Sequence, residues 1–349
     1  MASHAQHEKF ALPQGSDILV TGANGFIGSH VCKELLQIDF NVKEAVRDTK
    51  KCSWLTQALG LQTSRGHFTL VALPSMEIEE NFHVLMQGVS AVIHVASPVS
   101  FSTIPQDVIP TSVAGALNAL KATNKSPAVK RFVLTSSSVA AALPRPEEEG
   151  VEVSFHSWNT DSVISAWQEG HDDPQRAWHV YTASKVEAEG AVWDFHRSDT
   201  TRRADLIINT DQVNQGHAST SSFIQSMWYG MHSDRLSQIP AQYFVDVQDT
   251  ARLHVAGAVL HSVQNERIFA WAEPWNFNRI LEILRIHYPQ RMFLENFHHE
   301  HDLSSVSGPR SRALEILNQL GRDGFVSLED SILGNVQDLA QSYNRGKGT

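Results

Sequence analysis

One short segment near the N-terminus constrains the fold more than any other feature of the chain. Residues 17–21 (DILVT) form an apolar run of strand length, the sequence TGANGFIGSH overlaps its end, and residues 26–36 carry apolar side chains at helical spacing. Gly22, Gly25 and Gly28 therefore stand between an expected strand and an expected helix. Glycines at these offsets allow a tight turn, close backbone approach to a pyrophosphate and close helix packing. The segment predicts a dinucleotide-binding turn at a helix N-terminus.

The rest of the N-terminal half repeats this alternation of strands and helices. Apolar runs of strand length occur at 42–46, 68–73, 91–95 and 131–135, with stretches of helical spacing between them such as 113–123. Strands that alternate with helices predict a parallel sheet covered on both faces. We expect an α/β fold, a Rossmann-type doubly wound parallel sheet with a smaller mixed C-terminal substrate lobe.

The second half of the chain is less regular. Residues 144–175 are rich in Pro, Glu, Asp and Trp and lack clear periodicity, which predicts a long connection over the mouth of the sheet. Further helices are expected at 181–196, 249–261 (capped by Asp249), 277–287 and 310–320, and further strands at 205–209 and 267–272. The expected parts are a polar leader at 1–14, a mainly dinucleotide-binding domain at 15–210 and a mainly substrate-binding lobe at 211–349, from which 239–272 returns to the core.

The composition excludes several other classes of protein. With 42% hydrophobic and 19% charged residues, the chain is typical of a folded domain. Its net charge is −10 and it has no dense cluster of Lys and Arg, so we expect no nucleic-acid partner. Cys32 and Cys52 are too few for a disulfide framework, and no segment has the character of a signal peptide or membrane span. We expect a cytoplasmic protein without membrane contact, and no metal site at the polar run 298–301 (HHEH), which lacks a second ligand cluster.

The end of the second expected strand indicates which dinucleotide is bound. NAD enzymes usually place Asp or Glu there to bind the ribose hydroxyls, whereas Arg accommodates a 2′-phosphate. Here the strand ends in Val46 and Arg47, and Lys51 is near in sequence. Both cations could hold the phosphate through charge-assisted hydrogen bonds; the alternative is that they are solvated surface charges beside Asp48. The residues favour NADPH over NADH.

A tyrosine, a lysine and a run of serines are candidates for proton chemistry. Tyr181 and Lys185 lie four residues apart in YTASK, on one face of an expected helix. A nearby cation favours the phenolate and brings a phenol pKa of about 10 closer to neutral pH. Serines 136–138 follow the strand at 131–135, at the sheet edge where open α/β sheets bind ligands. Their hydroxyls could bind a substrate carbonyl, or they could bond only to loop backbone.

Taken together, these motifs resemble those of the extended short-chain dehydrogenase/reductases, the NAD-dependent epimerase/dehydratase type. The segments VTGANGFIGSHV, AVIHVASPVSF, KRFVLTSSS, YTASK and FVDVQDTARLH carry the resemblance. They are similar to the motifs of dihydroflavonol reductases, cinnamoyl-CoA reductases and, most closely, fungal aldehyde and carbonyl reductases. The similarity runs from about residue 12 to the C-terminal LEILNQLGRDGFVSLEDSI.

The resemblance implies a catalytic set of Ser137, Tyr181 and Lys185, with Ser137 as the third residue of the TSS motif. It implies that a carbonyl carbon receives hydride from NADPH while Tyr181 donates a proton to the oxygen. Lys185 would lower the phenol pKa and hold the nicotinamide ribose, and Ser137 would orient the carbonyl. The motifs and the resemblance together assign cofactor binding to Gly22, Asn24, Gly25, Phe26, Ile27, Gly28, Arg47, Lys51, Ser75, Val95, Ala96, Ser97, Tyr181 and Lys185.

Two departures from the family pattern keep other functions open. Ser75 stands where the family has an acidic residue for the adenine, and the stretch IINTDQVNQGHAST lacks the Pro-containing segment that packs on the nicotinamide. The first hypothesis is NADPH-dependent reduction of an aldehyde or ketone to the alcohol, for example in secondary metabolism. The alternatives are a catalytically weak or inactive dinucleotide-binding sensor or interaction protein, and an epimerase or dehydratase. The expected partner is a small carbonyl compound, and the residues leave a monomer and a homodimer both open.

Overall fold

A seven-stranded sheet with the order β3-β2-β1-β4-β5-β6-β8 forms the centre of the molecule. The computed structural model describes residues 9–60, 66–98, 100, 102–145, 148, 150–168, 175–213, 217–231, 233–237, 239–298 and 308–346. The strands are β1 (Asp17–Thr21), β2 (Asn41–Val46), β3 (Phe68–Ala72), β4 (Val89–His94), β5 (Arg131–Thr135), β6 (Ile207–Val213) and β8 (Arg267–Ala270). Every neighbouring pair is parallel, and the chain reverses its direction across the sheet between β1 and β4. The predicted doubly wound sheet is confirmed, and the reversal marks the crevice where such sheets bind ligands.

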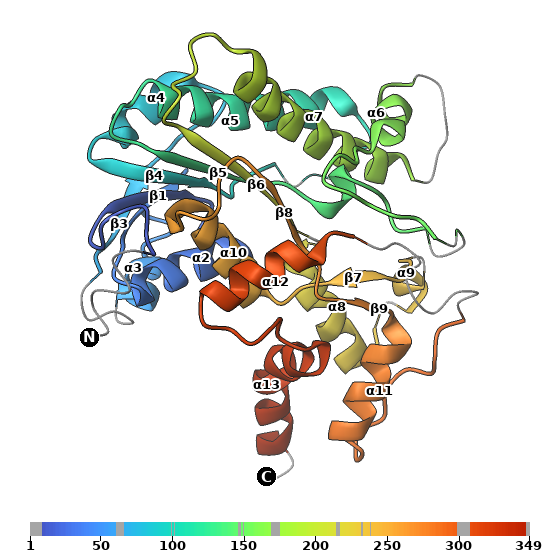
Figure 1. Cartoon of the computed structure of the whole chain (residues 1–349). Helices are drawn as coiled ribbons and strands as arrows, with labels where there is room; N and C mark the ends of the chain where they lie inside the picture. Colours follow the sequence, from blue (N-terminus) through green and yellow to red (C-terminus); the bar gives the residue numbers. More distant parts are fainter. Residues whose placement is uncertain are drawn as a thin grey trace.

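Helices cover both faces of this sheet (Figure 1). One face carries α4 (Glu79–His83), α5 (Pro105–Asn124) and α7 (Arg176–Ser198), with α6 (Thr160–Trp167) packed on α7. The other face carries α2 (Phe26–Gln37), α3 (Trp54–Gly60), α10 (Val247–Val259) and α12 (Arg310–Gln319). Short 3₁₀ turns, η1 (Val84–Met86) and η2 (Ser138–Ala140), follow α4 and β5.

A smaller lobe lies below the sheet in Figure 1. It contains α8 (His217–Tyr229), α9 (Ser233–Leu236), α11 (Phe277–His287), α13 (Leu328–Gly346) and an antiparallel pair of strands, β7 (Gln242–Phe244) and β9 (Glu273–Trp275). Trp228 of α8, Leu281 of α11 and Val336 of α13 are buried in one apolar cluster. This cluster gives the lobe a core of its own beside the carboxyl edge of the sheet.

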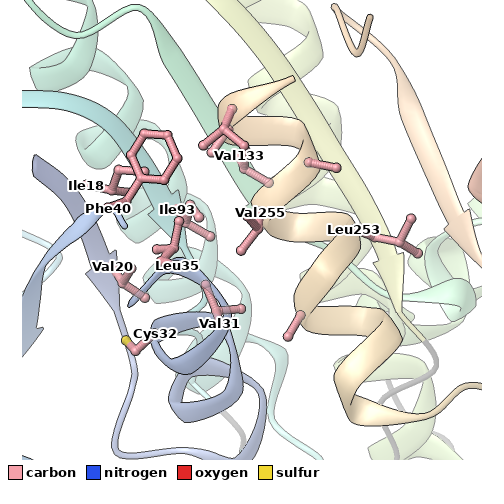
Figure 2. Packing of buried hydrophobic residues seen from close by; sticks show 14 of the residues in the cluster. Ile18, Val20, Val31, Cys32, Leu35, Phe40, Ile93, Val133, Leu253 and Val255 are labelled. Carbon is pink, nitrogen blue, oxygen red and sulfur yellow. The ribbon is translucent and has the colours of Figure 1, made fainter. Parts of the chain in front are cut away.

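The core under the sheet explains why the strands read as continuous apolar runs. Ile18, Ile93 and Val133 come from β1, β4 and β5 and pack against Leu35 of α2 and Val255 of α10 (Figure 2). All five are essentially inaccessible to solvent. Strands covered on both faces bury every side chain, so apolar residues do not alternate with polar ones. Each such burial stabilises the fold by about 1.5–3 kcal/mol.

Several expected elements differ in detail. The segment at 144–175 contains α6, which begins after Asn159, whose side chain accepts a hydrogen bond from Ser162 N at 3.2 Å. Strand β6 continues to Val213, beyond the expected end at 209. Helix α10 is capped by Asp246 and not by Asp249, because α10 begins one turn earlier than its apolar periodicity indicates. Helices α8 and α13 were not expected from the sequence.

The Asp246 side chain caps α10 and also binds a residue of the smaller lobe, so its removal should lower the stability of the fold. Its carboxylate accepts from Gln248 N at 2.8 Å and from Ser331 Oγ of α13 at 2.7 Å. We expect Asp246→Ala to lower the free energy of unfolding by about 1–2 kcal/mol, because both donors lose their partner. Urea unfolding measures this, with Asp194→Ala as the control. The Asp194 side chain is 73% exposed, so its loss should change stability by less than about 0.5 kcal/mol. Equal effects of the two substitutions would contradict the assignment of the cap.

Candidate active site

The glycine turn joins β1 to α2 with almost no spare space. Gly22 has a φ of +84°, and a Cβ on it would lie 2.9 Å from Ala96 N. A Cβ on Gly28 would lie 2.3 Å from the carbonyl oxygen of Gly22, far inside van der Waals contact. Gly25 is the last residue before α2, so the free N–H groups of that helix begin at the turn. The turn can present these N–H groups and the positive end of the helix dipole to an anion.

A buried carboxyl group supports this turn from inside the sheet. Glu44 of β2 is fully buried, its Oε1 accepts from Ala23 N at 2.6 Å, and its Oε2 lies 3.8 Å from Cys32 Sγ. Burial raises the pKa of Glu44 well above its usual range, although the backbone N–H groups of Ala23 and Gly22 act in the opposite direction. The shift favours the neutral acid, and so acts against a fixed negative charge beneath an anion-binding turn. None of the sequence motifs includes this residue; its signal is a carboxylate inside the otherwise apolar end of β2.

A cavity of about 1100 Å³ opens from the turn along the carboxyl edge of the sheet. This volume slightly exceeds the range of roughly 300–1,000 Å³ that is typical of small-molecule sites. Val245, Val247 and Thr250, at the start of α10, form part of its wall. All the residues that the sequence assigns to cofactor binding, apart from Tyr181 and Lys185, line it: Gly22, Asn24, Gly25, Phe26, Ile27, Gly28, Arg47, Lys51, Ser75, Val95, Ala96 and Ser97.

One end of the cavity carries the two predicted cations. Arg47 and Lys51 are both exposed, and Lys51 Nζ lies 4.0 Å from Asp48 Oδ2. The other oxygen of Asp48 accepts from the backbone N–H groups of Lys50 and Lys51, so this carboxylate is held in its own turn. Within the described parts of the chain Arg47 forms no ion pair, and its guanidinium is therefore the stronger candidate for a phosphate.

The wall near Ser75 contains an acidic residue after all. Ser75 Oγ accepts from Glu77 N at 3.2 Å, and Ser75 O accepts from Asn81 Nδ2 at 2.9 Å. Glu77 itself lines the cavity. A carboxylate is thus available two residues after Ser75 for an amino group such as that of adenine.

Tyr181, Lys185 and Ser137 come together behind this cavity. Tyr181 and Lys185 lie on the sheet-facing side of α7, Ser137 lies between β5 and η2, and all three are at most 3% exposed. Lys185 Nζ lies 5.8 Å from the centroid of the Tyr181 ring. Burial raises the pKa of Tyr181 to about 12, while the neighbouring Ser137 hydroxyl lowers it. Burial also lowers the pKa of Lys185 to about 8.

The shift of the phenol is a correction to the sequence-based expectation. The Tyr181 and Lys185 spacing predicts a lowered phenol pKa, but desolvation of the buried ring raises the pKa and outweighs the hydrogen bond with Ser137. The protonated phenol is therefore the dominant form at neutral pH.

His94 connects these three residues to the cavity. Burial and the charge of Lys185 lower the pKa of His94 to about 4, which places the ammonium close to the end of β4. Thr21 Oγ1 lies 3.1 Å from His94 Nδ1 and accepts from Ala96 N at 3.0 Å. The next residues, 95–97, line the cavity, whereas Ser137, Tyr181 and Lys185 are not among its described lining residues. Tyr181 and Lys185 thus lie beside the cavity wall and not in it.

The structure distinguishes the serines of the run. Ser136 Oγ donates to Glu189 Oε2 at 2.8 Å, so its hydroxyl is already bound. Ser137 Oγ is buried and lies next to the Tyr181 phenol, whose pKa it lowers. Unlike the Ser136 hydroxyl it is not held by Glu189, so it can bind a ligand oxygen together with the phenol, which supports the choice of Ser137.

A buried pair, His254 and Asp211, lies at the same edge of the sheet, on the face covered by α10 and not by α7. His254 of α10 has Nε2 at 2.7 Å from Thr135 Oγ1 and Nδ1 at 2.8 Å from Asp211 Oδ2. Burial lowers the pKa of His254, but the Asp211 carboxylate outweighs this and raises the pKa above its ordinary value. Asp211 belongs to the stretch that lacks the family's Pro. That stretch forms a regular strand as far as Val213, and residues 214–216 lie outside the described parts.

The two remaining expectations concern metals and membranes. No group of three or more His, Cys, Asp or Glu side chains within the described residues could hold a metal ion. Of the run 298–301, only the exposed His298 is described. In the same described parts, no helix combines the length and the apolar character needed to cross a membrane.

Comparison with known proteins assigns the chain to a family. Residues 18–267 match the NAD dependent epimerase/dehydratase family. The chain belongs to this family. It is 37% identical to aldehyde reductase 2 of Sporidiobolus salmonicolor over 94% of this chain and 97% of that protein. It is 32% identical to the NAD-dependent epimerase/dehydratase terH of Aspergillus terreus over 92% of this chain and 96% of the relative.

The fold is also that of solved reductase structures. The chain resembles the structure of yeast methylglyoxal/isovaleraldehyde reductase Gre2 complexed with NADPH. The TM-score is 0.75, and the two are 21% identical over 94% of this chain and 99% of that one. At this identity the likeness concerns the fold. The resemblance to extended short-chain dehydrogenase/reductases drawn from the sequence motifs is confirmed.

The contact between Gly28 and Gly22 gives a direct test of the turn. Gly28→Ala forces backbone atoms apart, so we expect a stability loss of about 1–3 kcal/mol and dinucleotide binding weakened by at least about tenfold. Fluorescence titration with NADPH and urea unfolding measure the two effects. Gly334→Ala on α13 is the control, because a Cβ there meets nothing within 4 Å. It should raise stability by up to about 1 kcal/mol and leave NADPH binding unchanged.

Proposed function

We propose that this protein is an NADPH-dependent reductase that converts an aldehyde or ketone to the alcohol. The observation that carries the proposal is the meeting of Tyr181, Lys185 and Ser137 beside the wall of a cavity that the glycine turn also lines. Relatives named as an aldehyde reductase, a ketoreductase and an NADPH-dependent methylglyoxal reductase support this reaction class. The partner is then a small carbonyl compound.

The residues of the cavity fit NADPH. The turn at Gly22, Gly25 and Gly28 leaves room only for backbone, as a pyrophosphate site requires, and the N–H groups at the start of α2 would hold the phosphates. Arg47, with Lys51, would bind the 2′-phosphate at the cavity rim. NADPH supplies a hydride when bound, and the protein supplies binding, orientation and the proton.

The protein's own side chains supply the proton for the reduction and determine when it is transferred. Tyr181 Oη donates its proton to the carbonyl oxygen, and Ser137 Oγ donates a hydrogen bond to the same oxygen. The pKa of Tyr181, about 12, keeps the proton in place at neutral pH, so the resting site suits reduction. A phenol with so high a pKa is a weak acid, and the ammonium of Lys185 is needed to stabilise the phenolate that proton transfer leaves.

The experiment that tests this function compares the wild type with Tyr181→Phe. NADPH consumption is measured with aliphatic aldehydes, aromatic aldehydes, β-keto esters and bulky polycyclic ketones. We expect turnover by the wild type and a kcat at least about 10²-fold lower in Tyr181→Phe, because the proton donor is lost while the ring stays. The Kd for NADPH should change by less than about twofold, since the turn is untouched.

The other outcomes favour the other functions. Equal turnover by Tyr181→Phe contradicts Tyr181 as the donor. NADPH binding without turnover on any substrate of the panel favours the sensor or interaction protein. Nucleotide that copurifies and recycles without net consumption favours an epimerase or dehydratase.

The cofactor preference has its own test at Arg47. Removal of a guanidinium that binds a phosphate through charge-assisted hydrogen bonds loses about 1.5–3 kcal/mol, so Arg47→Ala should raise the KM for NADPH by about tenfold or more. The KM for NADH, which has no 2′-phosphate, should stay within about twofold. Arg197→Ala, a 58% exposed cation at the far end of α7, serves as the control and should change neither value. Parallel loss with both cofactors in Arg47→Ala contradicts a 2′-phosphate role.

A further inference from the structure

A buried carboxylate follows the Tyr181 and Lys185 pair on the same side of α7. Glu189 lies four residues after Lys185 and eight after Tyr181, so all three side chains face the sheet from successive turns. Glu189 is completely buried. Neither the reaction proposed above nor the sequence motifs give this carboxylate a role.

The two oxygens of Glu189 receive hydrogen bonds from the residue after β5, from two strands and from α7 itself. Ser136 Oγ, just after β5, donates to Oε2 at 2.8 Å. Thr210 Oγ1 of β6 donates to Oε1 at 2.7 Å, and Arg267 Nε of β8 donates to Oε1 at 2.9 Å. Trp193 Nε1, one turn further along α7, also donates to Oε1 at 3.3 Å. One carboxylate thus ties α7 to the end of β5 and to both strands at this edge of the sheet.

Arg267 provides the charge that makes this burial tolerable. Its guanidinium is 7% exposed and pairs with Glu189, whereas a carboxylate buried without a cation would be strongly unfavourable. Arg267 Nη1 also donates to Phe155 O at 2.7 Å and to Ser157 O at 2.8 Å. The guanidinium lies 4.1 Å from the centroid of the Trp158 ring. The Glu189 and Arg267 pair is therefore held by residues 155–158 of the connection before α6 as well as by the sheet.

Ser136 connects the hydrogen bonds of Glu189 to the candidate active site. Ser136 is covalently next to Ser137, and its own N–H donates to Asp211 O at 2.8 Å. Its hydroxyl bond to Glu189 links the turn that carries Ser137 to the helix that carries Tyr181. A displacement of about 1 Å between groups that act on one carbonyl can reduce the rate about 10²-fold.

We propose that Glu189 is a positioning residue which, through Ser136, sets the placement of the Ser137 hydroxyl relative to the Tyr181 phenol. This role rests on the reductase function proposed above. Glu189 does not touch substrate; it acts by holding one side of the site against the other.

Two single substitutions separate positioning from general stability. Ser136→Ala and Thr210→Val each remove one hydroxyl bond to Glu189 and leave the bonds from Arg267 and Trp193 intact. Only the bond from Ser136 leads to Ser137. We expect Ser136→Ala to lower kcat by at least about tenfold with the Kd for NADPH within about twofold, and Thr210→Val to keep kcat within about twofold. The thermal midpoints of the two variants should be similar.

A double-mutant cycle with Glu189→Gln tests whether Ser136 acts through the carboxylate. If it does, adding Ser136→Ala to Glu189→Gln lowers kcat by less than about twofold further. Should Glu189→Gln not fold, the comparison of Ser136→Ala with Thr210→Val decides alone. Full activity in Ser136→Ala, or equal losses of kcat in both single variants, overturns the positioning role. Absence of turnover in the wild type on the whole panel contradicts the reductase function itself, which is a different result.

Discussion

The contact between the backbones of Gly28 and Gly22 determines how β1 passes into α2, and much of the site depends on that passage. Because a Cβ at Gly28 would lie 2.3 Å from the Gly22 oxygen, the helix can start this close to the strand only with glycine at that position. The close start directs the N–H groups of α2 at the cavity along the sheet edge. Gly22 must also leave room for Ala96, which follows β4, so the same turn fixes the part of the cavity wall that Ala96 forms. Glu44 completes the arrangement from below, since its carboxyl group accepts from Ala23 N without a cation beside it among the described residues.

Buried polar groups hold the sheet edge beyond the turn from both faces. On the α7 face Glu189 binds side chains of Ser136, Thr210 and Arg267, and on the α10 face His254 lies between Thr135 and Asp211. Buried charges are tolerated only when their partners are in place, so each cluster restricts its strands to one arrangement. The ends of β5 and β6 lie between the two clusters. Ser137 follows directly on this fixed segment, which explains how a residue of a turn can be placed as reproducibly as one within a strand.

The sequence predicts those parts of the molecule that local rules determine. Continuous apolar runs identify the parallel strands because both faces of such a sheet are covered. The glycine offsets identify the turn, and the spacing of Tyr181 and Lys185 places both on one side of a helix. Tertiary contacts decide the remainder. Asp246 and Asp249 are equally good caps in sequence, and only the contact of Asp246 with Ser331 of α13 shows why the helix begins where it does. Similarly, α6 depends on the Asn159 cap and on packing against α7, neither of which produces a long periodic pattern.

The protonation of the site shows most clearly what sequence spacing cannot provide. Tyr181 and Lys185 at four residues apart suggest a cation that lowers a phenol pKa, and this would hold on an exposed helix. Packing of α7 on the sheet instead buries both groups, which raises the pKa of Tyr181 to about 12 and lowers that of Lys185 to about 8. Both shifts favour the neutral forms, because desolvation acts against charge of either sign. Once proton transfer has formed the phenolate, the phenolate and the ammonium attract each other. This attraction offsets part of the desolvation penalty of both buried charges. Burial thus makes Lys185 more important to the phenolate than it would be in water, since the same two charges interact more strongly in a less polar surrounding.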